Sequence, residues 1–94
     1  MWKELLRVRT RNLKDTDRAI RVIGSVFDGQ KLPRDLVGYH IYRCATHQNE
    51  IMLEVGWNST VTNLGGSELV SRLAFSMKEL GLVDISAWYR KPDR

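Results

Sequence analysis

The chain has 94 residues, of which 43% are hydrophobic and 28% are charged, and its formal net charge is +4 at pH 7. This composition is typical of one soluble globular domain and argues against a disordered tail or a membrane span. The Lys and Arg residues form no run of the kind that nucleic-acid binders use, so we expect one domain over residues 1–94 with neither nucleic acid nor membrane as a partner.

The N-terminal third predicts a strand followed by a helix. The segment KELLRVRTR, residues 3–11, alternates, with Leu6 and Val8 on one side. The segment DTDRAIRVIGSVF, residues 15–27, places its apolar residues at helical spacing, with Asp15 or Thr16 in a capping position. Residues 28–35 contain Gly, Pro and polar residues, which predict a loop.

The stretch GYHIYRCATHQNEIMLEVGW, residues 38–57, predicts a β-hairpin with strands 39–44 and 50–57 and a four-residue turn at 46–49. If Ala45 lies opposite Glu50, one face holds His40, Tyr42, Cys44, Ile51, Leu53, Val55 and Trp57. The other face then holds Arg43 and Glu54 as a cross-strand ion pair, beside Tyr39, Ile41, Met52 and Gly56. Both faces would carry bulky apolar groups, so we expect both to be covered.

The C-terminal third predicts a second helix and a last strand. Ser67 is a candidate cap, the apolar residues between 69 and 80 follow the helical period, and Gly81 is a candidate terminator. Residues 83–90 alternate as a strand. The order β-α-β-β-α-β predicts a ferredoxin-like α+β fold, with an antiparallel four-stranded sheet and both helices on one face.

The short chain and the uncovered sheet face together favour a homodimer. A domain of this length buries only about 60–65% of its unfolded surface, so additional apolar burial against a second copy would stabilise it. The only cysteine, Cys44, cannot form an internal disulfide, and the stretch MWKELLRVRT has no long apolar signal region. We therefore expect a cytoplasmic protein.

Three short motifs carry a family resemblance: YHIYR at 39–43, NE at 49–50, and an apolar strand that ends in Trp57 and is followed by Ser59. With this order and spacing, the chain resembles the antibiotic biosynthesis monooxygenase-like family over residues 3–90. The resemblance implies a dimeric α+β barrel with a pocket between sheet and helices. Several members of that family oxidise phenolic or quinol-like substrates with oxygen and without a bound metal or flavin.

The resemblance has departures that bear on activity. Leu53 stands where one branch of the family has Asn. The sequence GGS at 65–67 stands where the related haem-degrading members have His, so we do not expect haem degradation.

The resemblance implies that Trp57 is a catalytic and ligand-binding residue. His40 is a candidate general base, and Tyr42 is a candidate ligand contact. Each has a structural alternative, because an aromatic residue at a strand end often packs in the core and a strand histidine is often only hydrogen-bonded. Cys44 lacks a visible activating base, and Cys44, His40 and His47 are few for a metal site, so we expect no metal. The family resemblance implies that no cofactor is bound.

Two functional hypotheses remain open, and whether the protein is an enzyme is left open with them. The first is a cofactor-independent monooxygenase-like protein that binds a small aromatic molecule of the phenol or quinol type. The second is a non-catalytic dimeric module for ligand binding or interaction. RNA recognition by the same topology is less favoured, because VGYHIYRC lacks the basic-Gly-aromatic-Gly spacing.

Overall fold

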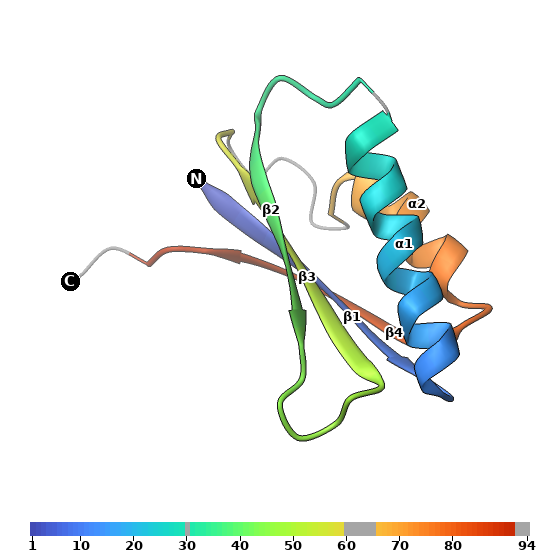
Figure 1. Cartoon of the computed structure of the whole chain (residues 1–94). Coiled ribbons are helices and arrows are strands. Elements are labelled where there is room, and N and C mark those ends of the chain that lie inside the picture. The colour runs from blue at the N-terminus through green and yellow to red at the C-terminus, as the bar shows by residue number, and fades with distance from the viewer. Residues whose placement is uncertain (30, 60–65, 92–94) are drawn as a thin grey trace.

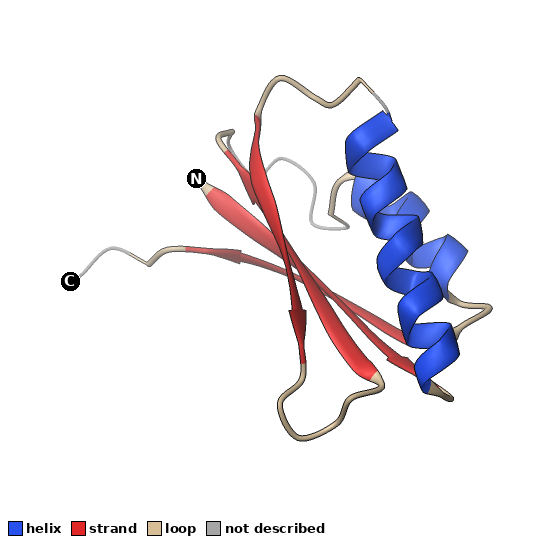
Figure 2. Cartoon of the chain, in the orientation of Figure 1, coloured by secondary structure: helices blue, strands red, loops and turns tan. Residues whose placement is uncertain are grey.

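A computed structural model describes residues 1–29, 31–59 and 66–91, and Figure 1 shows one twisted sheet with both helices on one of its faces. The strands and helices are coloured by type in Figure 2. The sheet is four-stranded and antiparallel, in the order β2-β3-β1-β4. The predicted order and the ferredoxin-like α+β fold are confirmed. The elements are β1 (Trp2–Thr10), α1 (Leu13–Gly29), β2 (Leu36–Arg43), β3 (Glu50–Trp57), α2 (Glu68–Met77) and β4 (Gly81–Tyr89).

The first helix begins earlier than its apolar pattern predicts. The side chain of Asn12 accepts a hydrogen bond of 2.9 Å from the backbone N–H of Asp15, which is the role of an N-terminal cap. Thr16 is instead buried in the first turn, where its hydroxyl lies 2.6 Å from that of Thr10. The prediction of Asp15 or Thr16 as the cap was therefore wrong.

The second helix has the predicted cap. The hydroxyl of Ser67 accepts a hydrogen bond of 3.2 Å from the backbone N–H of Val70. Gly81 does not end this helix but begins β4, where a Cβ atom would overlap the carbonyl oxygen of Arg9. No helix among the described residues is long and apolar enough to cross a membrane.

The core lies between the sheet and the helices. It consists of the alternate residues of β1 and β3 together with one stripe of each helix. Burying one such aliphatic side chain stabilises a fold by about 1.5–3 kcal/mol relative to exposure, so this layer holds the domain together. Its fully buried members include Leu6, Val8, Ala19, Ile23, Ile51, Leu53, Val55, Val70 and Met77.

The hairpin is present, but its predicted register was wrong by one residue. Tyr39 lies opposite Val55, and His40 lies opposite Glu54. Residues 44–49 connect β2 and β3, and the backbone N–H of Cys44 donates to the carbonyl of Glu50 at 2.8 Å, so the loop beyond this last backbone contact is 45–49. Tyr39 consequently faces the helices, where its ring stacks on Phe27 with centroids 4.0 Å apart.

The corrected register divides the sheet into an apolar face under the helices and a mixed face on the other side. We call the second one the open face. Its large apolar side chains lie among charged ones, and ion pairs join Arg7 with Asp84 and Lys3 with Glu54. Arg43 lies on the helix side and pairs with Asp17 of α1, so the predicted Arg43–Glu54 pair was wrong. The open face consists of Lys3, Leu5, Arg7, Arg9, Gly38, His40, Tyr42, Glu50, Met52, Glu54, Gly56, Leu82, Asp84, Ser86 and Trp88.

Candidate functional site

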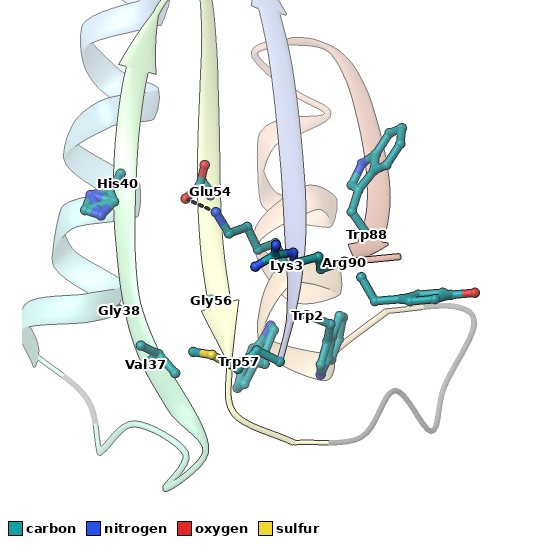
Figure 3. A pocket seen from close by; sticks show the side chains of 12 residues that line it. Trp2, Lys3, Val37, Gly38, His40, Glu54, Gly56, Trp57, Trp88 and Arg90 are labelled. Carbon is teal, nitrogen blue, oxygen red and sulfur yellow. Dashed lines mark ion pairs between the residues drawn. The ribbon is translucent and has the colours of Figure 1, made fainter. Parts of the chain in front are cut away.

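A cavity of about 640 Å³ lies at the end of the open face where β1 begins and β3 ends. Figure 3 shows this end of the sheet from the side that faces away from the helices. We call it the terminal cavity. Aromatic and polar side chains from all four strands line it, among them Trp2, Lys3, His40, Glu54, Trp57, Trp88 and Tyr89.

Two glycines form the floor of the terminal cavity. Gly38 and Gly56 lie directly opposite each other on β2 and β3, so neither strand projects a side chain over this part of the sheet. A Cβ atom on Gly38 would meet no atom within 4 Å. The hollow is thus produced by the absence of side chains at a cross-strand pair, which is visible only once the register is known.

The polar groups of the terminal cavity gather around Glu54. His40 lies directly opposite this residue on β2, and the ammonium group of Lys3 lies 3.4 Å from the Glu54 carboxylate. His40 is solvent-exposed at the β2 edge of the sheet. An exposed imidazole opposite a carboxylate is placed to accept a proton from a ligand.

Trp57 contributes little surface to the terminal cavity, because only 3% of it is exposed. Its indole N–H donates a hydrogen bond of 2.8 Å to one carboxylate oxygen of Glu4, and the other oxygen accepts one of 2.9 Å from the backbone N–H of Ser67. Glu4 is fully buried. A carboxylate at the first turn of α2 also interacts favourably with the helix dipole. Trp57 therefore belongs to a buried polar link between β1, β3 and α2.

Sequence reasoning missed Glu4, although a signal for it exists. Glu4 has the same parity in β1 as Leu6 and Val8, which face the core. An acidic residue at such a position requires hydrogen-bond donors, since a buried charge without partners is costly. Gly66 completes this link: its φ is +88°, and a Cβ atom there would lie 2.6 Å from the Glu4 carboxylate. Of the GGS segment, positions 66 and 67 are described and position 65 lies outside the described residues.

Two further residues of the family resemblance, Ser59 and Asn49, also make structural contacts. Trp2 stacks on Trp57 with ring centroids 5.8 Å apart, and its indole N–H donates to the hydroxyl of Ser59 at 3.1 Å. The side-chain amide of Asn49 donates to the backbone carbonyl of Thr10 at 2.7 Å, which joins the hairpin loop to β1. These contacts give structural reasons for the quoted motifs.

Tyr42 does not line the terminal cavity. It borders a second hollow of about 340 Å³ further along the open face, beside Cys44 and Met52. Its ring centroid lies 6.3 Å from that of His40. The structure thus brings His40 and Trp57 to one cavity, with His40 exposed and Trp57 buried, and places Tyr42 in the neighbouring one.

Cys44 has an environment that the sequence did not indicate. Hydrogen bonds, first from the hydroxyl and backbone of Thr46 and then from His47, lower the pKa of the Cys44 thiol from 9.0 to about 7. The ligand atoms of Cys44, His47 and Glu50 lie within 4.8 Å of one another. His40, which the sequence analysis considered together with Cys44 and His47, is not part of this group.

No model of a protein family and no curated protein sequence matches the chain. Solved structures do match it. A putative antibiotic biosynthesis monooxygenase from Deinococcus radiodurans superposes with a TM-score of 0.70 at 11% identity, over 100% of this chain and 96% of that one. A cofactor-independent oxygenase from Streptomyces nogalater has a TM-score of 0.64 at 10% identity, over 99% and 97% of the two chains.

A conserved protein of Bacteroides thetaiotaomicron, described as of unknown function and a possible oxidoreductase, has a TM-score of 0.70 at 12% identity, over 93% of this chain and 94% of that one. Identities this low support a common fold and no more. Several solved structures that carry the name antibiotic biosynthesis monooxygenase therefore have the fold of this chain over nearly its whole length.

Proposed function

We propose that this protein is a small cofactor-independent monooxygenase-like protein that binds a phenol or quinol in the terminal cavity. The observation that carries the proposal is the cavity itself, about 640 Å³ in size with Trp88, Lys3 and His40 in its lining. Ligand sites for small molecules have volumes in this range and combine apolar walls with a few polar groups. The fold shared with a cofactor-independent oxygenase adds support.

The proposed reaction starts with proton transfer. An imidazole nitrogen of His40 accepts the hydroxyl proton of the phenol, and Lys3 stabilises the resulting phenolate. The phenolate transfers one electron to O₂, and the two radicals combine to form a carbon–oxygen bond. The O–O bond then breaks as the same ring carbon loses its proton. One oxygen atom stays in the product as a quinone carbonyl and the other leaves as water, so phenol and O₂ balance with quinone and water.

The proposed ligand site differs from the one that the family resemblance implies, which is a pocket between sheet and helices. The pocket between sheet and helices stays a prediction. The terminal cavity lies at the end of the sheet, where Lys3, His40 and Trp88 of the open face line it together with Trp2, Trp57 and Tyr89 of the helix-facing register. A second copy on the open face would cover the cavity and exclude water from it. We propose this homodimer as part of the function, since exposed Leu82 and Trp88 would be buried in it. The area buried should exceed about 1,000 Å² in total.

Oxygen uptake in the presence of a panel of phenols and quinols tests the proposed activity. The parent should consume one O₂ for each phenol converted to quinone, and His40→Gln should lower the rate at least about 100-fold, the low end of a general-base contribution. Arg21→Gln, at an exposed site on α1, is the matched control and should keep the parent rate. Equal rates for the parent and His40→Gln would remove His40 from the reaction.

The second candidate is a non-catalytic dimeric ligand-binding module, and the Trp57 contact favours it. The indole N–H of Trp57 already donates to Glu4, so it is not available to a substrate. Calorimetry with the same phenols separates the candidates. Binding without oxygen uptake, with parent-like affinity in His40→Gln, would identify the module.

A further inference from the structure

The hairpin loop between β2 and β3 brings three different ligand types together on the open face. Cys44 and Glu50 are direct cross-strand neighbours, because the backbone N–H of Cys44 donates to the carbonyl of Glu50 at 2.8 Å. Side chains of directly opposed residues lie on the same face of a sheet. His47 lies in the loop that joins these two residues, and the N–H of Glu50 donates to the His47 carbonyl at 3.0 Å, which fixes the turn.

The distances fit one small cation. The thiol sulfur of Cys44 lies 4.0 Å from Nδ1 of His47, and all three ligand atoms lie within 4.8 Å of one another. Tetrahedral zinc with bonds of about 2.3 Å to sulfur and about 2.0 Å to nitrogen requires a sulfur–nitrogen separation of about 3.5 Å. Side-chain rotations must therefore bring the sulfur and nitrogen about 0.5 Å closer, and must close a pair at the 4.8 Å limit by about 1.2 Å, which χ rotations of these side chains can do. The ligands come from one loop and the two strand ends that it joins, so no movement between elements is needed.

We infer that Cys44, His47 and Glu50 form a site for a divalent cation of borderline softness, of which Zn²⁺ is the representative. Thiolate, imidazole and carboxylate are the three ligand types of zinc sites, and a set of three leaves a fourth position for water. A hard cation such as Mg²⁺ or Ca²⁺ would not use the sulfur. The cation joins the two strand ends and fixes the loop.

Neighbouring groups can support the ligands. The hydroxyl of Thr46 lies 3.4 Å from the Cys44 sulfur and can donate to the thiolate. Arg9 pairs with one carboxylate oxygen of Glu50 at 3.3 Å and leaves the other oxygen for the cation. Groups in these positions orient metal ligands and commonly contribute 10- to 100-fold to affinity.

Cobalt titration of the full-length chain tests the site. The titration uses protein without an affinity tag, so that no added histidine binds cobalt, and a phosphine keeps the Cys44 thiol reduced. Co²⁺ should give a thiolate charge-transfer band and the strong visible bands of tetrahedral cobalt, with one ion bound per chain and full displacement by Zn²⁺. Cys44→Ser should abolish the charge-transfer band, and His47→Gln and Glu50→Gln should each weaken binding by more than about tenfold, since loss of a group that only orients a ligand already costs about that much.

The chain contains one other histidine, which provides the matched control. His40→Gln removes an imidazole from β2, outside the cluster, and it should leave the cobalt spectrum and affinity unchanged. Circular dichroism of every variant checks that the fold is intact. An unchanged spectrum in Cys44→Ser, equal affinities for His47→Gln and His40→Gln, or one ion for two chains would each overturn the inference.

This site is independent of the proposed oxygenase activity. Cobalt binding is measured without substrate, and Cys44→Ser alters no residue of the terminal cavity. Loss of oxygen uptake in His40→Gln with intact cobalt binding would support both proposals.

Discussion

Replacing Trp57 by Phe should destabilise the domain more than replacing Trp2 by Phe, although the two indoles stack on each other. Both side chains are nearly buried, with 3% and 8% of their surface exposed. They differ in the acceptor of the indole N–H. Trp57 donates to the buried carboxylate of Glu4, whereas Trp2 donates to the hydroxyl of Ser59. Both substitutions replace an indole by a phenyl ring, so they remove the same atoms. They differ in the strength of the hydrogen bond that is lost.

The difference can be estimated from the two bonds. A hydrogen bond to a charged group contributes about 1.5–3 kcal/mol and a neutral one about 0.5–1.5 kcal/mol. Trp57→Phe should therefore lower the free energy of unfolding by about 1–2 kcal/mol more than Trp2→Phe does. For a domain of this size each kcal/mol corresponds to about 4–8 °C in Tm, so the two variants should separate clearly in a melt.

Urea unfolding followed by circular dichroism, at one protein concentration for all variants, gives the free energies. Combining each Phe variant with Glu4→Gln completes two double-mutant cycles. We expect a coupling of about 1–2 kcal/mol between Trp57 and Glu4, and a smaller coupling between Trp2 and Glu4, because Trp2 donates to Ser59 and meets Glu4 only through the stacked Trp57 ring. Equal costs for the two Phe variants, or additivity in the Trp57 cycle, would refute the assignment of Glu4 as the buried partner of Trp57.

Three further predictions concern the open face and the hairpin loop. Gly38→Val should keep the fold, since a Cβ atom there meets nothing within 4 Å, and should weaken binding of a phenol in calorimetry by placing a side chain over the glycine floor of the terminal cavity. Leu82→Asp should shift the chain from dimer to monomer in sedimentation at micromolar concentration while the circular dichroism spectrum stays unchanged, because Leu82 is 75% exposed in the isolated chain. With a chelator present, the rate at which iodoacetamide alkylates Cys44 should reach half its maximum near pH 7 and not near 9.0, because hydrogen bonds from Thr46 and His47 favour the reactive thiolate. Thr46→Val should move this midpoint to higher pH.

Much of the fold could be predicted because its elements have strong local signals. The alternation of β1 and the helical spacing of the apolar residues in α1 and α2 predict those elements directly, and the β-α-β-β-α-β order follows. The boundaries were less predictable. Asn12 caps α1 through a contact with Asp15, and other polar residues near the start of that helix have the same local preference.

The candidate site depended on information that local patterns do not contain. Trp57 and His40 could be singled out as residue types, but their relative placement follows from the pairing of β2 with β3. A loop of four residues, in place of the observed loop at 45–49, moves every β2 side chain to the opposite face. Glu4 was missed for a related reason, since its partners Trp57 and Ser67 lie more than 50 residues away along the chain.

The register is set by burial, and its functional consequences follow from there. Ile51, Leu53, Val55 and Trp57 alternate on β3 and must face the helices, so the apolar residues of β2 that can join them are Tyr39 and Ile41. Placing His40 there would bury an imidazole, which costs free energy unless both of its ring nitrogens find hydrogen-bond partners. The pairing that satisfies the core also sends His40 to the open face and places Gly38 opposite Gly56, and it brings Cys44 alongside Glu50. The terminal cavity and the proposed cation site therefore both depend on the register of β2 against β3. A variant that shifted this register by one residue would lose both.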